Sequence, residues 1–80
     1  MELLRNIRIY VFPAHRLVLN EIHPNRSMQD LTEYLRSKLH LGSKVEFDFI
    51  REATGEQIPL WKSLRAARIQ DNEVLVAKQK

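Results

Sequence analysis

A single amphipathic helix lies between two groups of strand patterns, and this order limits what the chain can fold into. Ser27 is of the residue type that caps helix N-termini, and Asp30 follows it at the spacing of a capping box. Apolar residues then recur at helical spacing up to Leu39, and Gly42 stands where a C-cap glycine is expected. We therefore predict a helix over about 28–40. One helix can cover only one face of one sheet.

Alternating apolar and polar residues predict a hairpin before this helix. Residues 5–12 alternate, Pro13 interrupts the pattern because it lacks a ladder donor, and 16–22 continue as the second strand. The alternation slips between Leu19 and Ile22, which indicates a β-bulge there.

Three further segments complete the predicted sheet. Residues 44–50 alternate between apolar and mostly acidic side chains, and 73–77 form the last strand with Val74 and Val76 facing inward. Residues 57–60 form at most a short edge strand. The order ββαβ(β)β predicts an α+β fold, a four- or five-stranded mixed sheet on one helix, with the first and last strands side by side. The predicted core includes Leu31, Leu35, Val45, Phe47, Ile69 and Val74.

Two segments resemble the ubiquitin-like β-grasp superfamily. Residues 22–31, Ile-His-Pro-Asn-Arg-Ser-Met-Gln-Asp-Leu, are similar to its passage from a strand end into the helix. Residues 64–74 resemble its Leu-x-x-x-x-Ile turn before the final strand. The resemblance covers about residues 5–77 and implies one ubiquitin-like domain over 1–80. The turn at 69–73 also resembles that of small bacterial YukD-type proteins of type VII secretion, although Asn72 replaces the usual glycine.

The last residues distinguish this sequence from the conjugated members of the superfamily. Conjugated modifiers end in Gly-Gly, whereas this sequence ends Ala-Lys-Gln-Lys. We expect that the chain as written is not conjugated, and a modifier whose Gly-Gly tail is missing from this sequence stays an alternative. Glu46 and Asp48 are expected to point outward from the third strand. The apolar recognition patch of ubiquitin would then be altered, so generic ubiquitin-binding partners should not recognise the chain.

The composition argues against catalysis and against a bound cofactor. The chain has no cysteine, which excludes disulfides, zinc sites built on cysteine and thiol catalysis. The three histidines, His15, His23 and His40, lack metal-binding spacing, and two glycines form no phosphate-binding loop. We expect no catalytic residue, no cofactor and no metal.

The charge pattern is that of a soluble protein rather than of a dedicated nucleic-acid binder. Thirteen basic and ten acidic residues give a net charge of +3, and the two signs are interspersed. No 18-residue apolar run and no signal-peptide pattern occur, so we expect a cytoplasmic protein without membrane insertion. A small basic RNA- or ribosome-associated domain stays the alternative function. The oligomeric state is left open.

The outer face of the predicted sheet carries the candidates for binding a protein partner. With Ile7 and Ile9 under the helix, the opposite face is expected to present Arg8, Tyr10, Phe12, Val18 and Leu75. Scattered surface apolar residues are the alternative interpretation. Trp61 is expected either to fold over the edge of the core or to be an exposed anchor. The predicted function is a non-catalytic ubiquitin-like protein-interaction module, with an accessory role in a bacterial secretion system as the nearest specific interpretation.

Overall fold

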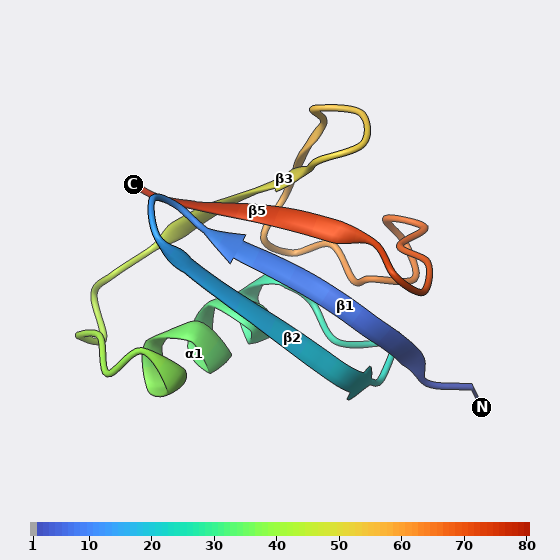
Figure 1. Ribbon diagram of the computed structural model, residues 1–80, viewed down its shortest axis with the longest axis horizontal. Coiled ribbons are helices and arrows are strands. Elements are labelled where there is room, and N and C mark those ends of the chain that lie inside the picture. The colour runs from blue at the N-terminus through green and yellow to red at the C-terminus, as the bar shows by residue number, and fades with distance from the viewer. Residues whose placement is uncertain (1) are drawn as a thin grey trace.

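The computed structural model describes residues 2–80, which form one helix packed on one side of a five-stranded sheet (Figure 1). The elements are β1 (Leu4–Val11), β2 (His15–Ile22), α1 (Met28–Lys38), β3 (Phe47–Arg51), β4 (Gln57–Ile58) and β5 (Val74–Gln79). The strand order is β2-β1-β5-β3-β4. β1 and β5 pair in parallel at the centre, and the other neighbours are antiparallel. The predicted fold class and the central pairing are confirmed. No helix of the described residues is long and apolar enough to cross a membrane.

The hairpin of β1 and β2 keeps one register along its whole length. Leu4 lies opposite Ile22, and Ile7 lies opposite Leu19, so each strand has two residues between these pairs. The predicted bulge is therefore wrong, because neither strand carries an extra residue. The side chains change face in both strands together. Asn6, with a φ of 56°, takes the left-handed backbone conformation at this point on β1, which asparagine tolerates better than most residues.

The N-terminus of α1 is capped as the sequence predicts. The Ser27 hydroxyl accepts a hydrogen bond from the Asp30 amide at 3.2 Å, and the Asp30 carboxylate accepts one from the Ser27 amide at 2.9 Å. The Met28 amide donates to the Lys62 carbonyl at 3.1 Å. Side chain and loop together satisfy amides that the helix itself leaves unpaired.

The C-terminus of α1 differs from the prediction. The helix ends at Lys38 rather than near residue 40, and the left-handed position after it is taken by His40, with a φ of 56°, not by Gly42. The Leu41 amide then reaches back to the Arg36 carbonyl at 2.8 Å, as in a Schellman motif. The helix therefore stops two residues early because a histidine adopts the conformation expected of the glycine.

The core lies between α1 and the sheet and contains buried side chains from every element except β2, whose apolar residues pack against it partly buried. The predicted core residues Leu31, Leu35, Phe47 and Ile69 are confirmed as buried. Val45 is only half-buried, because β3 begins at residue 47 and not at 44. The complete set of buried apolar residues is Ile7, Ile9, Val11, Met28, Leu31, Leu35, Phe47, Phe49, Ile58, Leu64, Ile69, Leu75 and Ala77.

β5 turns toward the core the face that the sequence analysis predicts to be outward. Leu75 is completely buried, whereas Val74 and Val76 are half-buried on the other face. The predictions of a core Val74 and an outward Leu75 are both wrong. All four residues of Val-Leu-Val-Ala are apolar, so the alternation alone cannot identify the inner face. The parallel register decides it, because Leu75 lies opposite the buried Ile9 of β1.

Candidate functional site

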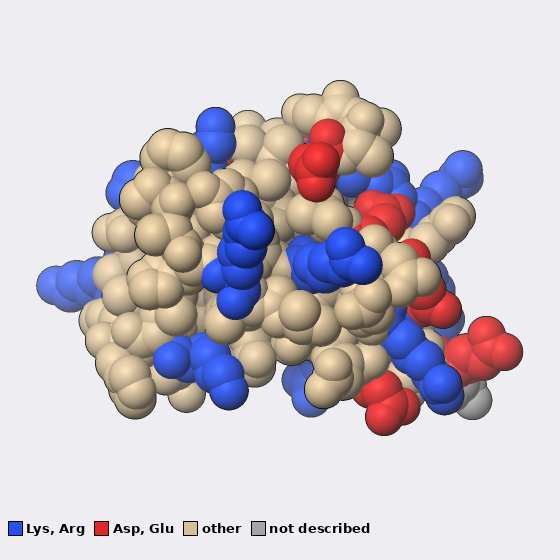
Figure 2. All heavy atoms as spheres, in the orientation of Figure 1, with Lys and Arg blue, Asp and Glu red and all other residues tan. Residues whose placement is uncertain are grey.

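The sheet face turned away from the core carries aromatic, aliphatic and basic side chains from β1, β2, β5 and the hairpin turn. We call this set the outer patch: Arg8, Tyr10, Phe12, Arg16, Val18, Val74, Val76 and Lys78. In Figure 1 these three strands lie toward the viewer. Figure 2, in the same orientation, shows basic side chains spread over a largely uncharged surface. The acidic side chains visible in this view lie in the half toward the N-terminus.

The strand register arranges the outer patch in rows across three strands. The middle member of each row comes from β1, the strand between β2 and β5. Paired residues in a sheet place their side chains on the same face, so each row forms a continuous contact surface. The two rows are Val18–Arg8–Val74 and Arg16–Tyr10–Val76.

The two aromatic rings of the outer patch are held by their neighbours. The rings of Tyr10 and Phe12 meet edge to face, with centroids 6.5 Å apart and an angle of 74° between planes. The Tyr10 hydroxyl donates to the Pro13 carbonyl in the hairpin turn. The Arg16 guanidinium lies over the Tyr10 ring at 5.5 Å, and the Lys78 ammonium lies over the Phe12 ring at 5.9 Å. Both rings are therefore positioned before any partner arrives, although Phe12 is 55% exposed.

The basic side chains of the outer patch form no ion pair within residues 2–80. The ion pairs among residues 2–80 join Arg51 to Glu73 and Lys80 to Asp48, and neither involves the patch. Asp48 lies opposite Lys78 in the β3–β5 ladder, but its carboxylate is shared by Lys80 at 3.6 Å and the Gln57 amide at 3.2 Å. Of the two acidic residues predicted to point outward, Glu46 and Asp48, the charge of Asp48 is thus partly neutralised. The patch itself stays positively charged.

Four of the five predicted site residues come together on this face, and one does not. Arg8, Tyr10, Phe12 and Val18 all belong to the outer patch. Leu75 was predicted beside Tyr10, but it is completely buried, and Val76 occupies that place. Sequence reasoning also missed Arg16 and Val74. Arg16 precedes Val18 by two residues in β2, so the alternation of that strand could have identified it.

Two hollows flank β2 and differ in their charge. One, of about 340 Å³, lies within the outer patch and is lined by Arg8, Ile9, Tyr10, Arg16, Leu17, Val18, Glu52 and Val74. The other, of about 530 Å³, lies between β2 and α1 and is lined by Leu19, Glu21, Ile22, Arg26, Asp30, Leu31, Glu33, Tyr34 and Ser37. The first has two basic groups and one acidic group, whereas the second has one basic and three acidic groups.

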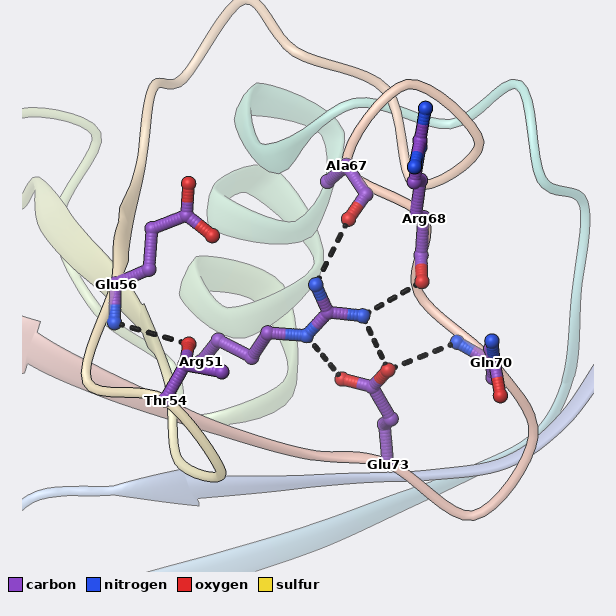
Figure 3. Close-up of polar contacts among 7 residues, drawn as sticks. All are labelled: Arg51, Thr54, Glu56, Ala67, Arg68, Gln70 and Glu73. Carbon is purple, nitrogen blue, oxygen red and sulfur yellow. Dashed lines mark hydrogen bonds and ion pairs between the residues drawn. The ribbon is translucent and has the colours of Figure 1, made fainter.

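A polar cluster outside the outer patch fixes the long connection before β5 (Figure 3). The Arg51 guanidinium binds the Glu73 carboxylate through two nitrogens, one of them at 2.8 Å, and donates to the carbonyls of Ala67 and Arg68 at 3.2 and 2.6 Å. The Gln70 amide also donates to this carboxylate at 3.2 Å. The hydrogen bond from Arg51 holds the pKa of Glu73 below its ordinary value, although burial opposes this shift. Both side chains are fully engaged, so we assign the cluster a structural role.

Trp61 lies in the connection between β4 and β5, far from complete burial. Its exposed fraction is 78%, so the interpretation that it folds over the edge of the core is wrong. The interpretation as an exposed anchor stays a prediction. Among residues 2–80, no three His, Asp or Glu side chains gather in a geometry that could hold a metal ion.

Comparison with known proteins identifies the fold but no near relative. No protein-family model matches the chain, and neither does any curated protein. Solved structures do match. A de novo protein designed on the basis of ubiquitin is 18% identical, with a TM-score of 0.75 over 95% of this chain and 88% of that one. The ubiquitin of Caldiarchaeum subterraneum is 15% identical, with a TM-score of 0.76 over 95% and 92%.

A third match is the N-terminal ubiquitin-like domain of the 4931431F19Rik protein. It is 13% identical, with a TM-score of 0.74 over 96% of this chain and 75% of that one. The fold is thus that of the ubiquitin-like β-grasp, as the sequence resemblance implied. At sequence identities this low, the similarity is evidence for the fold alone. The nearer resemblance to YukD-type proteins stays a prediction.

Proposed function

We propose that this chain is a non-catalytic protein-interaction module that binds its partner through the outer patch. The observation that carries the proposal is an accessible set of aromatic and aliphatic side chains on three paired strands and the hairpin turn, with Phe12 55% and Val18 50% exposed. Groups held by a rigid sheet lose little conformational entropy on binding. Tyrosine and arginine are also the residue types that contribute most at protein interfaces.

The turn before β5 supports a finer setting, an accessory component of a bacterial secretion system. The turn at 69–73 resembles that of YukD-type proteins, apart from Asn72 in place of glycine. Asn72 has a φ of 67°, the left-handed conformation that a glycine adopts most easily. Asparagine is the common substitute for glycine in this conformation, so the replacement is compatible with the same turn. Such a component would act in the cytoplasm.

The test removes two apolar side chains at the centre of the outer patch without touching the core. Tyr10→Ala combined with Val76→Ala should leave the fold intact, because both side chains lie on the outer face. Wild-type and variant proteins of equal thermal stability are used to capture partners from a native lysate treated with nuclease. Proteins retained by the wild type should bind the double variant at least about 30-fold more weakly, which corresponds to a hot-spot loss of roughly 2 kcal/mol.

Trp61→Ala is the matched control, because it removes a large exposed aromatic side chain outside the outer patch. Its partner profile should equal that of the wild type. The opposite result, loss of partners with Trp61→Ala and retention with the double variant, would place the working surface at the connection between β4 and β5. Partners that disappear after nuclease treatment would instead favour the RNA-associated alternative.

A further inference from the structure

Two arginines line the same hollow in the outer patch. Arg8 and Arg16 both border the cavity of about 340 Å³, together with Tyr10, Val18 and Val74. Arg8 lies opposite Val18, and Arg16 is two residues earlier on β2, so the two arginines are diagonal neighbours. Diagonal neighbours in a sheet are typically about 7–8 Å apart at the backbone, within reach of long side chains toward a common group. The walls between them are aromatic and aliphatic.

These two arginines are available for a negatively charged group. Neither takes part in an ion pair within residues 2–80. The Arg16 guanidinium lies over the ring of Tyr10 at 5.5 Å, and a guanidinium in such a contact can still donate hydrogen bonds from its edge. The planar fork of an arginine matches a carboxylate with two parallel N–H donors. The hollow thus combines arginine donors with aromatic and aliphatic lining residues.

The other lining residues decide between kinds of anion. Glu52 also lines the hollow, and its charge would oppose a doubly charged phosphate more strongly than a singly charged carboxylate. A nucleic acid would need free aromatic faces for stacking its bases. Arg16 and Lys78 lie over the rings of Tyr10 and Phe12, so a face of each ring is already occupied. A carboxylate on a protein segment fits these surroundings best.

We propose that the hollow between Arg8 and Arg16 binds a glutamate or aspartate side chain of an acidic protein segment. Apolar residues of the same segment cover Tyr10, Val74 and Val76. This inference rests on the proposed function, because it names the chemistry of the partner that the outer patch recognises. It requires acidic and apolar residues to be close together in that partner.

The test uses a synthetic ten-residue peptide in which leucine and glutamate alternate, blocked at both ends, and an otherwise identical peptide with glutamine for glutamate. Each is titrated into ¹⁵N-labelled protein and followed by NMR. The glutamate peptide should shift the signals of Arg8 and Arg16, including their side-chain Nε–H groups. It should bind at least about tenfold more tightly than the glutamine peptide, because arginine–carboxylate hydrogen bonds are the stronger kind.

Variants distinguish the paired hydrogen bonds of the two arginines from a general effect of positive charge on peptide binding. Arg8→Gln with Arg16→Gln should weaken the glutamate peptide at least about tenfold, whereas Lys44→Gln with Arg65→Gln, which changes the net charge equally on exposed residues elsewhere, should change it less than about twofold. Arg8→Lys with Arg16→Lys keeps the charge but loses the fork, so binding should still weaken at least about threefold. Thermal unfolding checks that each variant is folded.

Each contrary outcome has a distinct meaning. Equal binding of the two peptides, with both still weakened by Tyr10→Ala and Val76→Ala, would overturn the carboxylate inference and leave the proposed function standing. Insensitivity of both peptides to that double variant would count against the proposed function as well. Three further outcomes would also overturn the inference. The NMR shifts could centre on the hollow between β2 and α1, or an oligouridine could bind more tightly than the glutamate peptide. The third is that the glutamate peptide does not bind at about 1 mM, the weak end of specific affinities.

Discussion

Ile9 and Leu75 lie opposite each other in the central parallel pair of strands, and both side chains are buried in the core. This one pairing sets the face of every residue in β5. It places Leu75 inside and leaves Val74 and Val76 on the outer patch. The surface available to a partner therefore depends on a contact that the partner never touches.

Replacing Leu75 should lower the free energy of unfolding far more than replacing its neighbour Val76. Leu75→Ala removes a completely buried side chain, and we expect it to lower the free energy of unfolding by about 2–5 kcal/mol. Val76→Ala removes a half-buried side chain on the outer face, and we expect a loss of less than about 1.5 kcal/mol, as for other sites at the surface. Urea unfolding of both variants measures the difference. A larger loss for Val76→Ala would mean that the faces of β5 are reversed.

The ion pair between Arg51 and Glu73 should make stability depend on pH. The pKa of Glu73 is lowered in the folded state, mainly by the hydrogen bond from Arg51. The stabilisation is therefore fully present above the ordinary pKa of a glutamate, about 4.3, and is lost as the pH falls through the lower pKa of the folded state. Arg51 stays charged over this range, because its pKa is raised. Glu73→Gln should lack this component of the pH dependence.

Thermal unfolding at a series of pH values measures this effect. At pH 7 the wild type should be more stable than Glu73→Gln by about 1.5–3 kcal/mol, the usual contribution of hydrogen bonds to a charged group. The difference should shrink steadily below about pH 4. Glu33→Gln, which removes an exposed carboxylate from α1, is the control and should differ little from the wild type at pH 7. A constant difference between wild type and Glu73→Gln from pH 7 to pH 3 would contradict the prediction.

A glycine should stabilise the end of α1. His40 has a φ of 56°, a conformation that costs residues with a side chain roughly 1–2 kcal/mol and glycine almost nothing. Glycine also has more conformational freedom in the unfolded chain, and losing it on folding offsets part of this gain. His40→Gly should therefore raise the free energy of unfolding by up to about 1 kcal/mol. His40→Ala retains the backbone strain and should not be stabilising. A destabilised glycine variant would show that the histidine side chain itself stabilises the helix end.

Removing the helix cap should weaken the fold by a moderate amount. Ser27→Ala breaks the hydrogen bond from the Asp30 amide, and we expect the free energy of unfolding to fall by about 1 kcal/mol. Ser37→Ala, at an exposed position inside α1, should be neutral or slightly stabilising because alanine favours helices. Denaturant unfolding of the two variants provides the comparison. Equal stability of both would indicate that the loop carbonyls satisfy the first turn without the serine.

Local patterns predicted the elements whose residue types favour one arrangement. The Ser27 cap, the helix that follows it and the inward faces of β1 and β3 all follow from short-range periodicity and from capping chemistry. These features depend on neighbours within a few residues, so their cause is present in the sequence itself. The resemblance of residues 22–31 and 64–74 then pointed to the ubiquitin-like fold, which the solved structures confirm.

The sequence by itself determined the order of the elements, the capped helix and the apolar face of the first strand, because each is a local consequence of side-chain spacing. Tertiary structure alone decided the inner face of β5, the pairing of Arg51 with Glu73 and the place of Val74 and Val76 on the outer patch. All three depend on contacts between residues more than twenty positions apart. Val-Leu-Val-Ala is compatible with either face until β1 pairs with it, and that pairing places Leu75 in the core and Val76 beside Tyr10.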